Sequence, residues 1–322
     1  MRQAGRYMPE YQALKAQYSF LEICRKPEIA AKATMDAFNY LRPDAAIIFS
    51  DIMIPALAMG LELDFAPGPK LNRAIQTHDD VVSLKRPEPA KDLDFVMNAI
   101  QLTRAQLPSS ASLIGFVGAP LTLAAYLAEG APSKNWVGFK ETLYDRQSAF
   151  EALLERCVEA VTKHALAQVE AGCDAIQLFD TNAGMLHPLE LERFALASAG
   201  DVIAALREKV DVPIIYFARN VGAHLETVGA RTKADVLGID WSLQMRSAAD
   251  RLQSHAVMGN LDPTVLFASE DVVEKRTLAL LEEMKGRPGH IFNLGHGVLP
   301  KTPPPNARKI IETIRSFHSV EE

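Results

Sequence analysis

The chain has 322 residues, 48% of them hydrophobic and 23% charged, which is typical of a globular protein of one large or two modest domains. Its formal net charge of -6 argues against a general nucleic-acid binder, although a pocket for a small anion needs only local positive charge. No apolar run approaches the roughly 20 residues that span a bilayer, no signal-peptide pattern precedes the first helix, and the three cysteines form no CxxC pair, so we expect a cytoplasmic protein with reduced thiols.

The first seven residues carry two arginines around a short turn. Arg2 and Arg6 flank the segment Gln3-Ala4-Gly5, in which the glycine allows a sharp bend of the backbone. Each guanidinium presents a planar fork of donors that matches a carboxylate or a phosphate. The pair could therefore hold two anionic groups of one small molecule. The alternative is a solvated terminus with two surface arginines.

Short apolar runs recur along the chain, bounded by turn residues, and predict strands that are buried on both faces. The predicted strands are 45–50, 112–118, 175–180, 212–217, 235–240, 256–260 and 290–295. Helical segments are predicted between these strands. The stretch 55–89 is interpreted as a long connection that contains only short elements.

Alternation of strands and helices without a linker predicts a parallel sheet covered by helices. We expect one domain over residues 1–322 with a (β/α)8 TIM barrel fold. A doubly wound open sheet is the alternative, but the glycine-rich GxGxxG turn that usually follows its first strand is absent from that position.

Sites in such a barrel form at the carboxyl ends of the strands. The sequence places polar, glycine-rich or aromatic segments after the predicted strands, at 50–51, 118–120, 180–184, 219–220, 240–241, 260–262 and 295–297. Each has a purely structural alternative. Asp51, Asp180 and Asp240 could cap helices, His296 could be a turn residue, and Tyr126 could belong to the core.

Other common enzyme sites find little support in the sequence. We find no HExxH motif and no clustered His and Cys at the strand ends, so no metal site is expected. A serine hydrolase is equally disfavoured because the chain has no GxSxG elbow.

Six segments together resemble the uroporphyrinogen decarboxylase family of haem and chlorophyll biosynthesis. They are Met1–Tyr7, Phe49–Ile52, Gly118–Leu123, Phe179–Gly184, Gly259–Pro263 and Asn293–Gly297. They occur in the family's order over nearly the whole chain, and the first and last are highly specific.

The resemblance implies a single distorted (β/α)8 barrel and a carboxy-lyase that converts uroporphyrinogen III to coproporphyrinogen III by removing CO2 from four acetate side chains. It implies no cofactor, no metal and a homodimer whose clefts face each other. The family usually has a further N-terminal stretch before the arginine turn. We therefore expect the first barrel strand to be shortened or missing here, which puts the activity of this chain in question.

The resemblance also implies roles for individual residues. Carried over motif by motif, the substrate-binding residues are Arg2, Gln3, Ala4, Gly5, Arg6, Asp51, Tyr126, Thr181 and His296. Asp51 and Arg2 are the expected catalytic residues: Asp51 stabilises the protonated pyrrole intermediate, and Arg2 is a candidate proton donor, although arginine is a poor general acid in solution. Arg2, Arg6 and His296 are expected to offer positive charge to the substrate carboxylates.

Two other functions remain open at this point. A cobamide-dependent methyltransferase on a related scaffold would need zinc held by His and Cys at strand ends, and stoichiometric zinc would favour it. A catalytically inactive tetrapyrrole carrier would bind the porphyrinogen tightly and release no CO2.

Overall fold

The structure of the chain, a computed structural model, describes residues 2–65 and 68–319, with side chains through residue 317. Its larger sheet contains β1 (Ala45–Ile47), β4 (Ser112–Gly118), β5 (Ala175–Asp180), β6 (Ile214–Ala218), β7 (Val236–Gly238), β8 (Ala256–Leu261) and β9 (His290–Leu294). A small antiparallel pair consists of β2 (Leu63–Asp64) and β3 (Lys70–Leu71).

Helices connect and cover these strands. The α-helices before β5 are α1 (Pro9–Lys15), α2 (Phe20–Arg25), α3 (Pro27–Leu41), α4 (Pro55–Ala58), α5 (His78–Val82), α6 (Pro89–Asp92), α7 (Asp94–Gln106), α8 (Pro120–Glu129), α9 (Val137–Asp145) and α10 (Gln147–Glu170). Those after it are α11 (Pro188–Glu190), α12 (Ala197–Arg207), α13 (Leu225–Thr232), α14 (Met245–Arg251), α15 (Glu270–Met284) and α16 (Pro304–Ser319). Shorter turns are the 3-10 helices η1 (Ala183–Met185), η3 (Gly222–His224) and η4 (Pro263–Phe267) and the π-helix η2 (Leu191–Leu196).

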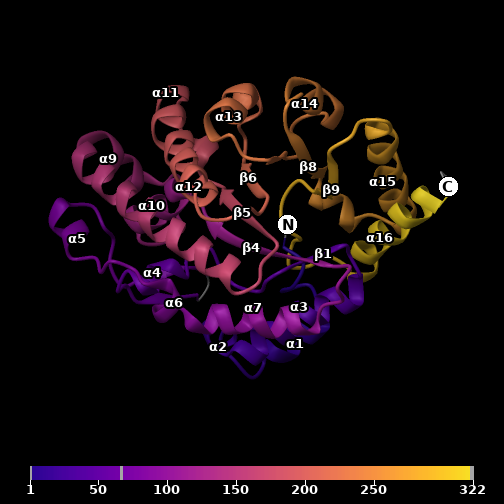
Figure 1. Cartoon of the computed structure of the whole chain (residues 1–322), viewed down its shortest axis with the longest axis horizontal. Coiled ribbons are helices and arrows are strands. Elements are labelled where there is room, and N and C mark those ends of the chain that lie inside the picture. The colour runs from indigo at the N-terminus through magenta and orange to yellow at the C-terminus, as the bar shows by residue number, and fades with distance from the viewer. Residues whose placement is uncertain (1, 66–67, 320–322) are drawn as a thin grey trace.

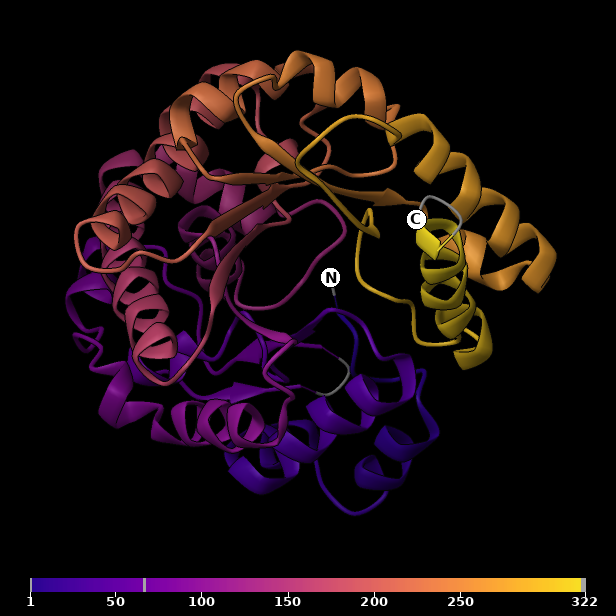
Figure 2. The same cartoon turned by 45° about the vertical axis from the view of Figure 1, so that its right-hand side comes forward.

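The seven strands of the larger sheet are all parallel and lie in the order β1-β4-β5-β6-β7-β8-β9. Figures 1 and 2 show the sheet curled, with the helices on its outer side. This order never reverses, as it would at the switch point of a doubly wound sheet, so the alternative fold is wrong. The α/β class with a parallel, helix-covered sheet is confirmed. Within the described residues no strand joins β9 to β1, and closure into an eight-stranded barrel is not confirmed.

The free edge of β1 is partly covered by the side chain of Gln3. Its amide nitrogen donates to the carbonyl of Ala45 at 2.7 Å, and its amide oxygen accepts from the N–H of Ile47 at 3.0 Å. One side-chain amide thus supplies the donor and the acceptor that a neighbouring strand would offer. Residues 2–44 contain α1, α2 and α3 and no strand.

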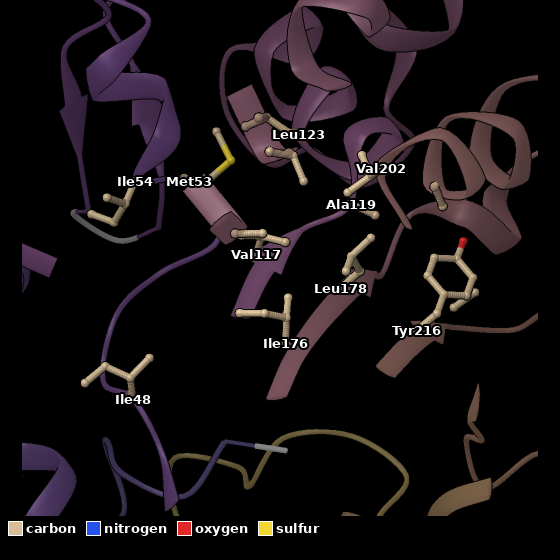
Figure 3. Packing of buried hydrophobic residues seen from close by; sticks show 14 of the residues in the cluster. Ile48, Met53, Ile54, Val117, Ala119, Leu123, Ile176, Leu178, Val202 and Tyr216 are labelled. Atoms are coloured by element: carbon tan, nitrogen blue, oxygen red, sulfur yellow. The ribbon is translucent and has the colours of Figure 1, made fainter. Parts of the chain in front are cut away.

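Successive side chains along each strand point to opposite faces of the sheet, and both faces are largely buried. Val117, Leu178 and Tyr216 are in register on adjacent strands and point toward the covering helices, and Figure 3 shows them packed near Leu123 and Val202. Each such fully buried apolar side chain contributes about 2 kcal/mol to folding. Buried apolar residues from α1 to α16 form one continuous cluster.

The expected strand 45–50 is shorter in the structure than in the sequence pattern. After β1, the N–H of Phe49 donates to the hydroxyl of Thr34 on α3 at 2.9 Å instead of continuing the ladder. The ring of Phe49 packs against Tyr11 at 5.4 Å and Phe20 at 5.6 Å. These contacts hold the backbone that leads to Asp51. Across the part of the chain that the structure describes, no helix has the length and apolarity to cross a membrane.

Candidate active site

The N-terminal arginine turn packs against the protein through its apolar residues, while Arg2 and Arg6 remain exposed. Ala4, Tyr7 and Met8 are buried, and the N–H of Met8 donates to the carbonyl of Gly5 at 3.0 Å. Gly5 adopts a φ of +135°, a conformation that side chains other than hydrogen rarely allow. The glycine of the motif is therefore required by the bend that separates the two arginines. The backbone of the turn is ordered, while the exposure of Arg2 and Arg6 agrees with the two surface arginines of the alternative, so the role of the pair in binding stays a prediction.

Arg2 and Arg6 face the carboxylate of Asp51. Asp51 is half-buried, and burial raises its pKa to about 6, against the opposing effects of the Met53 N–H and the two arginine charges. Burial likewise lowers the pKa of Arg2, with Asp51 as the main opposing influence. The structure thus brings Asp51 within electrostatic reach of both guanidinium groups.

The position of Asp51 follows from its own local turn. Its Oδ1 accepts from the N–H of Met53 at 2.9 Å, and its carbonyl accepts from the N–H of Ile54 at 3.2 Å. The next helix, α4, begins only at Pro55, so Asp51 bonds the turn before that helix rather than the helix N-terminus itself. This bond fixes one oxygen of the carboxylate, and the charges of the two arginines act on the group as a whole.

Two tyrosines complete the surroundings of this carboxylate. Tyr126 on α8 is half-buried, and burial raises its pKa, with further effects of Asp51 and Arg2. Its ring meets that of Trp136 edge-on at 4.8 Å, so its placement is fixed by packing. Tyr11 on α1 was not among the expected site residues. Burial raises its pKa to about 12, and Arg2, Arg6 and Asp51 all influence it.

His296 follows β9 and joins the same group through Arg2. The neighbouring Gly297 lies so close to Arg2 that an added Cβ would be 3.1 Å from the Cβ of Arg2. Burial lowers the pKa of His296 to about 4, assisted by the charges of Arg219 and Arg2. The buried surroundings and the two nearby cations both disfavour protonation of this imidazole in the absence of a ligand. That His296 offers positive charge to a bound carboxylate stays a prediction.

The loop after β5 is fixed by a buried hydrogen-bond network. Asp180 is fully buried and accepts from the hydroxyls of Thr122 at 2.6 Å and Tyr216 at 2.7 Å. Thr122 in turn accepts from the N–H of Asn182 at 3.1 Å. Thr181 lies between these anchored residues at the end of β5 and is half-buried. No described contact joins its side chain to the group around Asp51.

Gln3 and Ala4, the two residues that follow Arg2, play mainly structural parts. The side chain of Gln3 is engaged by β1, and Ala4 is buried in the core. Any contact that either makes with a ligand therefore falls to its backbone.

Sequence reasoning missed an aromatic wall on the inner face of the sheet. Phe116, Phe179 and Phe217 stand on β4, β5 and β6, with ring centroids 5.7 Å and 6.2 Å apart in succession. Phe217 then meets the imidazole of His296 at 6.1 Å. The period-two alternation of these strands was the available signal, because each phenylalanine falls on the face opposite the helix-packed residues.

Arg219 was noted only as a residue that follows a strand, although the structure places it beside this wall. It lies at the end of β6 with its guanidinium 5.7 Å from the ring of Trp241. The described residues contain no group of three His, Cys, Asp or Glu side chains that could hold a metal ion. All three cysteines are buried and free.

Comparison with known proteins gives consistent results. A family model described as "Uroporphyrinogen decarboxylase (URO-D)" matches residues 1–317. Proteins named "Uroporphyrinogen decarboxylase" from Geobacter sulfurreducens and Geotalea daltonii are each 44% identical to this chain, over 98% of it and 92% of their own length.

Solved structures share the fold at low sequence identity. A structure titled "methyltransferase from Methanosarcina mazei" matches with a TM-score of 0.83 and 19% identity, over 98% of this chain and 93% of its own. A putative vitamin-B12-independent methionine synthase from Listeria monocytogenes matches with a TM-score of 0.59 and 12% identity, over 98% of this chain and 96% of its own. At these identities the likeness concerns the fold alone.

Proposed function

Because the chain belongs to the uroporphyrinogen decarboxylase family, we propose that it converts uroporphyrinogen III to coproporphyrinogen III by removing CO2 from the four acetate side chains. The observation that carries this proposal is the half-buried carboxylate of Asp51 facing Arg2 and Arg6 at the carboxyl end of β1. A macrocycle with many carboxylates and several pyrrole N–H groups needs fixed cations and a convergent acceptor, and this group contains both.

The reaction needs a place for the electron pair that CO2 leaves behind. A proton added to a carbon of the pyrrole makes the ring cationic, the bond to CO2 then breaks, and its electron pair moves toward that ring. A second proton on the methylene carbon, which stays attached to the ring, gives the methyl group, and loss of the first proton from the ring carbon restores the neutral pyrrole, so that each decarboxylation takes up one proton in all. Asp51 stabilises the cationic ring by a preorganised negative charge, which is usually the largest contribution in such catalysis.

The remaining residues bind and orient the substrate. Arg2 and Arg6 hold side-chain carboxylates, and Arg2 is also the candidate donor of the first proton. Desolvation lowers the pKa of Arg2, which makes that role less unfavourable than in water. Tyr126, Thr181 and His296 supply hydrogen bonds, together with the backbone of residues 3–5. The half-buried rings of Phe116 and Phe179 offer an apolar surface to the macrocycle, and the fully buried Phe217 supports them from one side.

The wider family expectations belong to the same proposal. We propose one catalytic domain that acts as a distorted (β/α)8 barrel, and the covering of the β1 edge by Gln3 supports this. We also propose a cofactor-independent cytoplasmic homodimer with facing clefts. Light scattering of the purified chain tests the dimer, and a mass of one chain at all concentrations would contradict it.

The decisive experiment is incubation of the purified chain with uroporphyrinogen III under anaerobic conditions. After oxidation, products are separated by their number of carboxylates. We expect seven-, six- and five-carboxylate intermediates followed by the four-carboxylate product. Tight binding of the porphyrinogen without any loss of CO2 would instead identify a carrier.

A further inference from the structure

Arg219 is held in place by its backbone at the end of β6. Its N–H donates to the carbonyl of Asp180 at 3.3 Å, next to the buried network behind the aromatic wall. Its own carbonyl lies against Gly184, where an added Cβ would come within 2.3 Å of that oxygen. Only a glycine at position 184 permits this approach, so the two strand-end loops fix each other.

The guanidinium of Arg219 lacks the partners that a half-buried cation usually has. Its Nε is buried and has no hydrogen-bond partner within the described parts of the chain. The adjacent carboxylate of Asp240 is already engaged, because it accepts from the N–H groups of Asn220 at 2.6 Å and Ser242 at 2.8 Å. An unsatisfied buried donor is unfavourable for folding, and more so when it is charged, so its presence needs an explanation.

The side chain nevertheless has a defined direction. It stacks on Trp241, whose ring also meets His296 edge-on at a centroid distance of 6.5 Å. The charges of Arg219 and Arg2 both act on the imidazole of His296. Arg219 therefore contributes positive charge to the same inner face of the sheet as the N-terminal arginine turn, although the two come from segments far apart in sequence.

We propose that Arg219 binds a side-chain carboxylate of the substrate and is a specificity-determining residue of this site. A carboxylate placed at its fork would satisfy the unpartnered Nε–H and would complete the stack on Trp241. This inference rests on the proposed function, because it assumes a polycarboxylate ligand on the inner face of the sheet. It adds a third guanidinium to Arg2 and Arg6.

The test compares Arg219→Gln, Arg219→Lys and the matched control Arg308→Gln on the exposed face of α16. Removal of a carboxylate contact that is equally strong in the ground and transition states raises KM and leaves kcat nearly unchanged. We expect Arg219→Gln to raise KM at least tenfold with kcat within threefold of the parent. The KM of Arg219→Lys should lie between those of the parent and Arg219→Gln, because lysine keeps the positive charge and loses the paired donors of the guanidinium. The control should match the parent.

A binding measurement separates this inference from the proposed activity. The oxidised octacarboxylate uroporphyrin is titrated into each variant, and its fluorescence gives Kd at low and high salt. We expect Arg219→Gln to weaken binding at least tenfold at low salt, and to weaken it less at high salt. If the parent binds the octacarboxylate but releases no CO2, the proposed activity fails while this comparison still decides the role of Arg219.

A third measurement tests whether the charge of Arg219 lies near His296. The titration of the His296 ring protons by NMR should move to higher pH in Arg219→Gln, because one of the cations that oppose protonation is removed. KM and Kd of Arg219→Gln within twofold of the parent, in a protein with unchanged circular dichroism, would overturn the proposal.

Discussion

Two aspartates that follow or end strands of the sheet, Asp51 and Asp180, share a raised pKa and differ in their surroundings. Burial raises the pKa of both Asp51 and Asp180 to about 6. Asp180 is fully buried and is satisfied by two neutral hydroxyls on α8 and β6. Asp51 is half-buried, receives one backbone N–H, and otherwise faces the charges of Arg2 and Arg6.

The difference shows why a raised pKa alone does not identify a catalytic carboxylate. At Asp180 the surrounding hydroxyls complete the hydrogen bonds of the carboxylate, so it holds the β5 loop and has little left for a ligand. At Asp51 the partners are charges of an accessible turn, which a substrate can bridge. Raised pKa values mark functional sites only when geometry leaves the group available.

The largest expected effect comes from Asp51→Asn, which removes the charge of the carboxylate that faces the arginines. If Asp51 stabilises a cationic ring, loss of its charge should lower turnover by about 10²–10³-fold, the usual effect of removing one preorganised electrostatic partner. Product analysis by carboxylate count measures it, with Asp145→Asn on the exposed end of α9 as a control for loss of one negative charge. Unchanged formation of coproporphyrinogen by Asp51→Asn would refute the role.

Asp180→Ala should instead act on stability. It leaves the hydroxyls of Thr122 and Tyr216 without their acceptor in a fully buried position, at a cost of about 2–4 kcal/mol in the free energy of unfolding. Urea denaturation measures this value. Tyr216→Phe, which removes one of the two donors, should cost about 1 kcal/mol. If Asp51→Ala destabilised as much as Asp180→Ala, the proposed division between the two carboxylates would be wrong.

The pH dependence of stability sharpens the comparison further. Because the folded pKa of Asp51 is raised from 3.8 to about 6, its contribution to stability is fully present below pH 3.8 and is lost as the pH rises through 6. Asp51→Asn should therefore be more stable than the parent at pH 8, by about 1–2 kcal/mol after allowance for partial exposure.

This advantage should disappear as the pH approaches 4, where the parent carboxyl is neutral. Urea titrations of both proteins at several pH values measure the difference. A difference independent of pH would contradict the raised pKa.

The smallest expected effect concerns the edge of the sheet beside Asp51. Gln3→Ala removes two hydrogen bonds to β1 and should cost about 1 kcal/mol. The amide of Ile47 should then exchange with solvent about fivefold to tenfold faster. Gln17→Ala, which loses one weak contact at 3.4 Å on the surface of α1, is the matched control. Equal exchange of Ile47 in both variants would show that Gln3 does not hold this edge.

The sequence alone determined the elements and their order. Runs such as 112–118 and 175–180 are mostly apolar and bounded by turn residues, as in a strand covered on both faces, and these strands begin and end as predicted. Local chemistry also fixed helix starts, as at Ser19, whose side chain and that of Glu22 form a reciprocal cap for α2. The arginine turn with its glycine was equally visible, because the bend needs Gly5.

Only the tertiary structure decided which of the residues after the strands face one another. Asp180 and Asp51 both come at the end of a predicted apolar run. Asp180 nevertheless bonds hydroxyls on α8 and β6, whereas Asp51 lies near the two arginines. The lowered pKa of His296 and the unpartnered Nε of Arg219 depend on groups contributed by distant segments. Charge and hydrogen-bond satisfaction are sums over neighbours in space, and a linear pattern does not contain those neighbours.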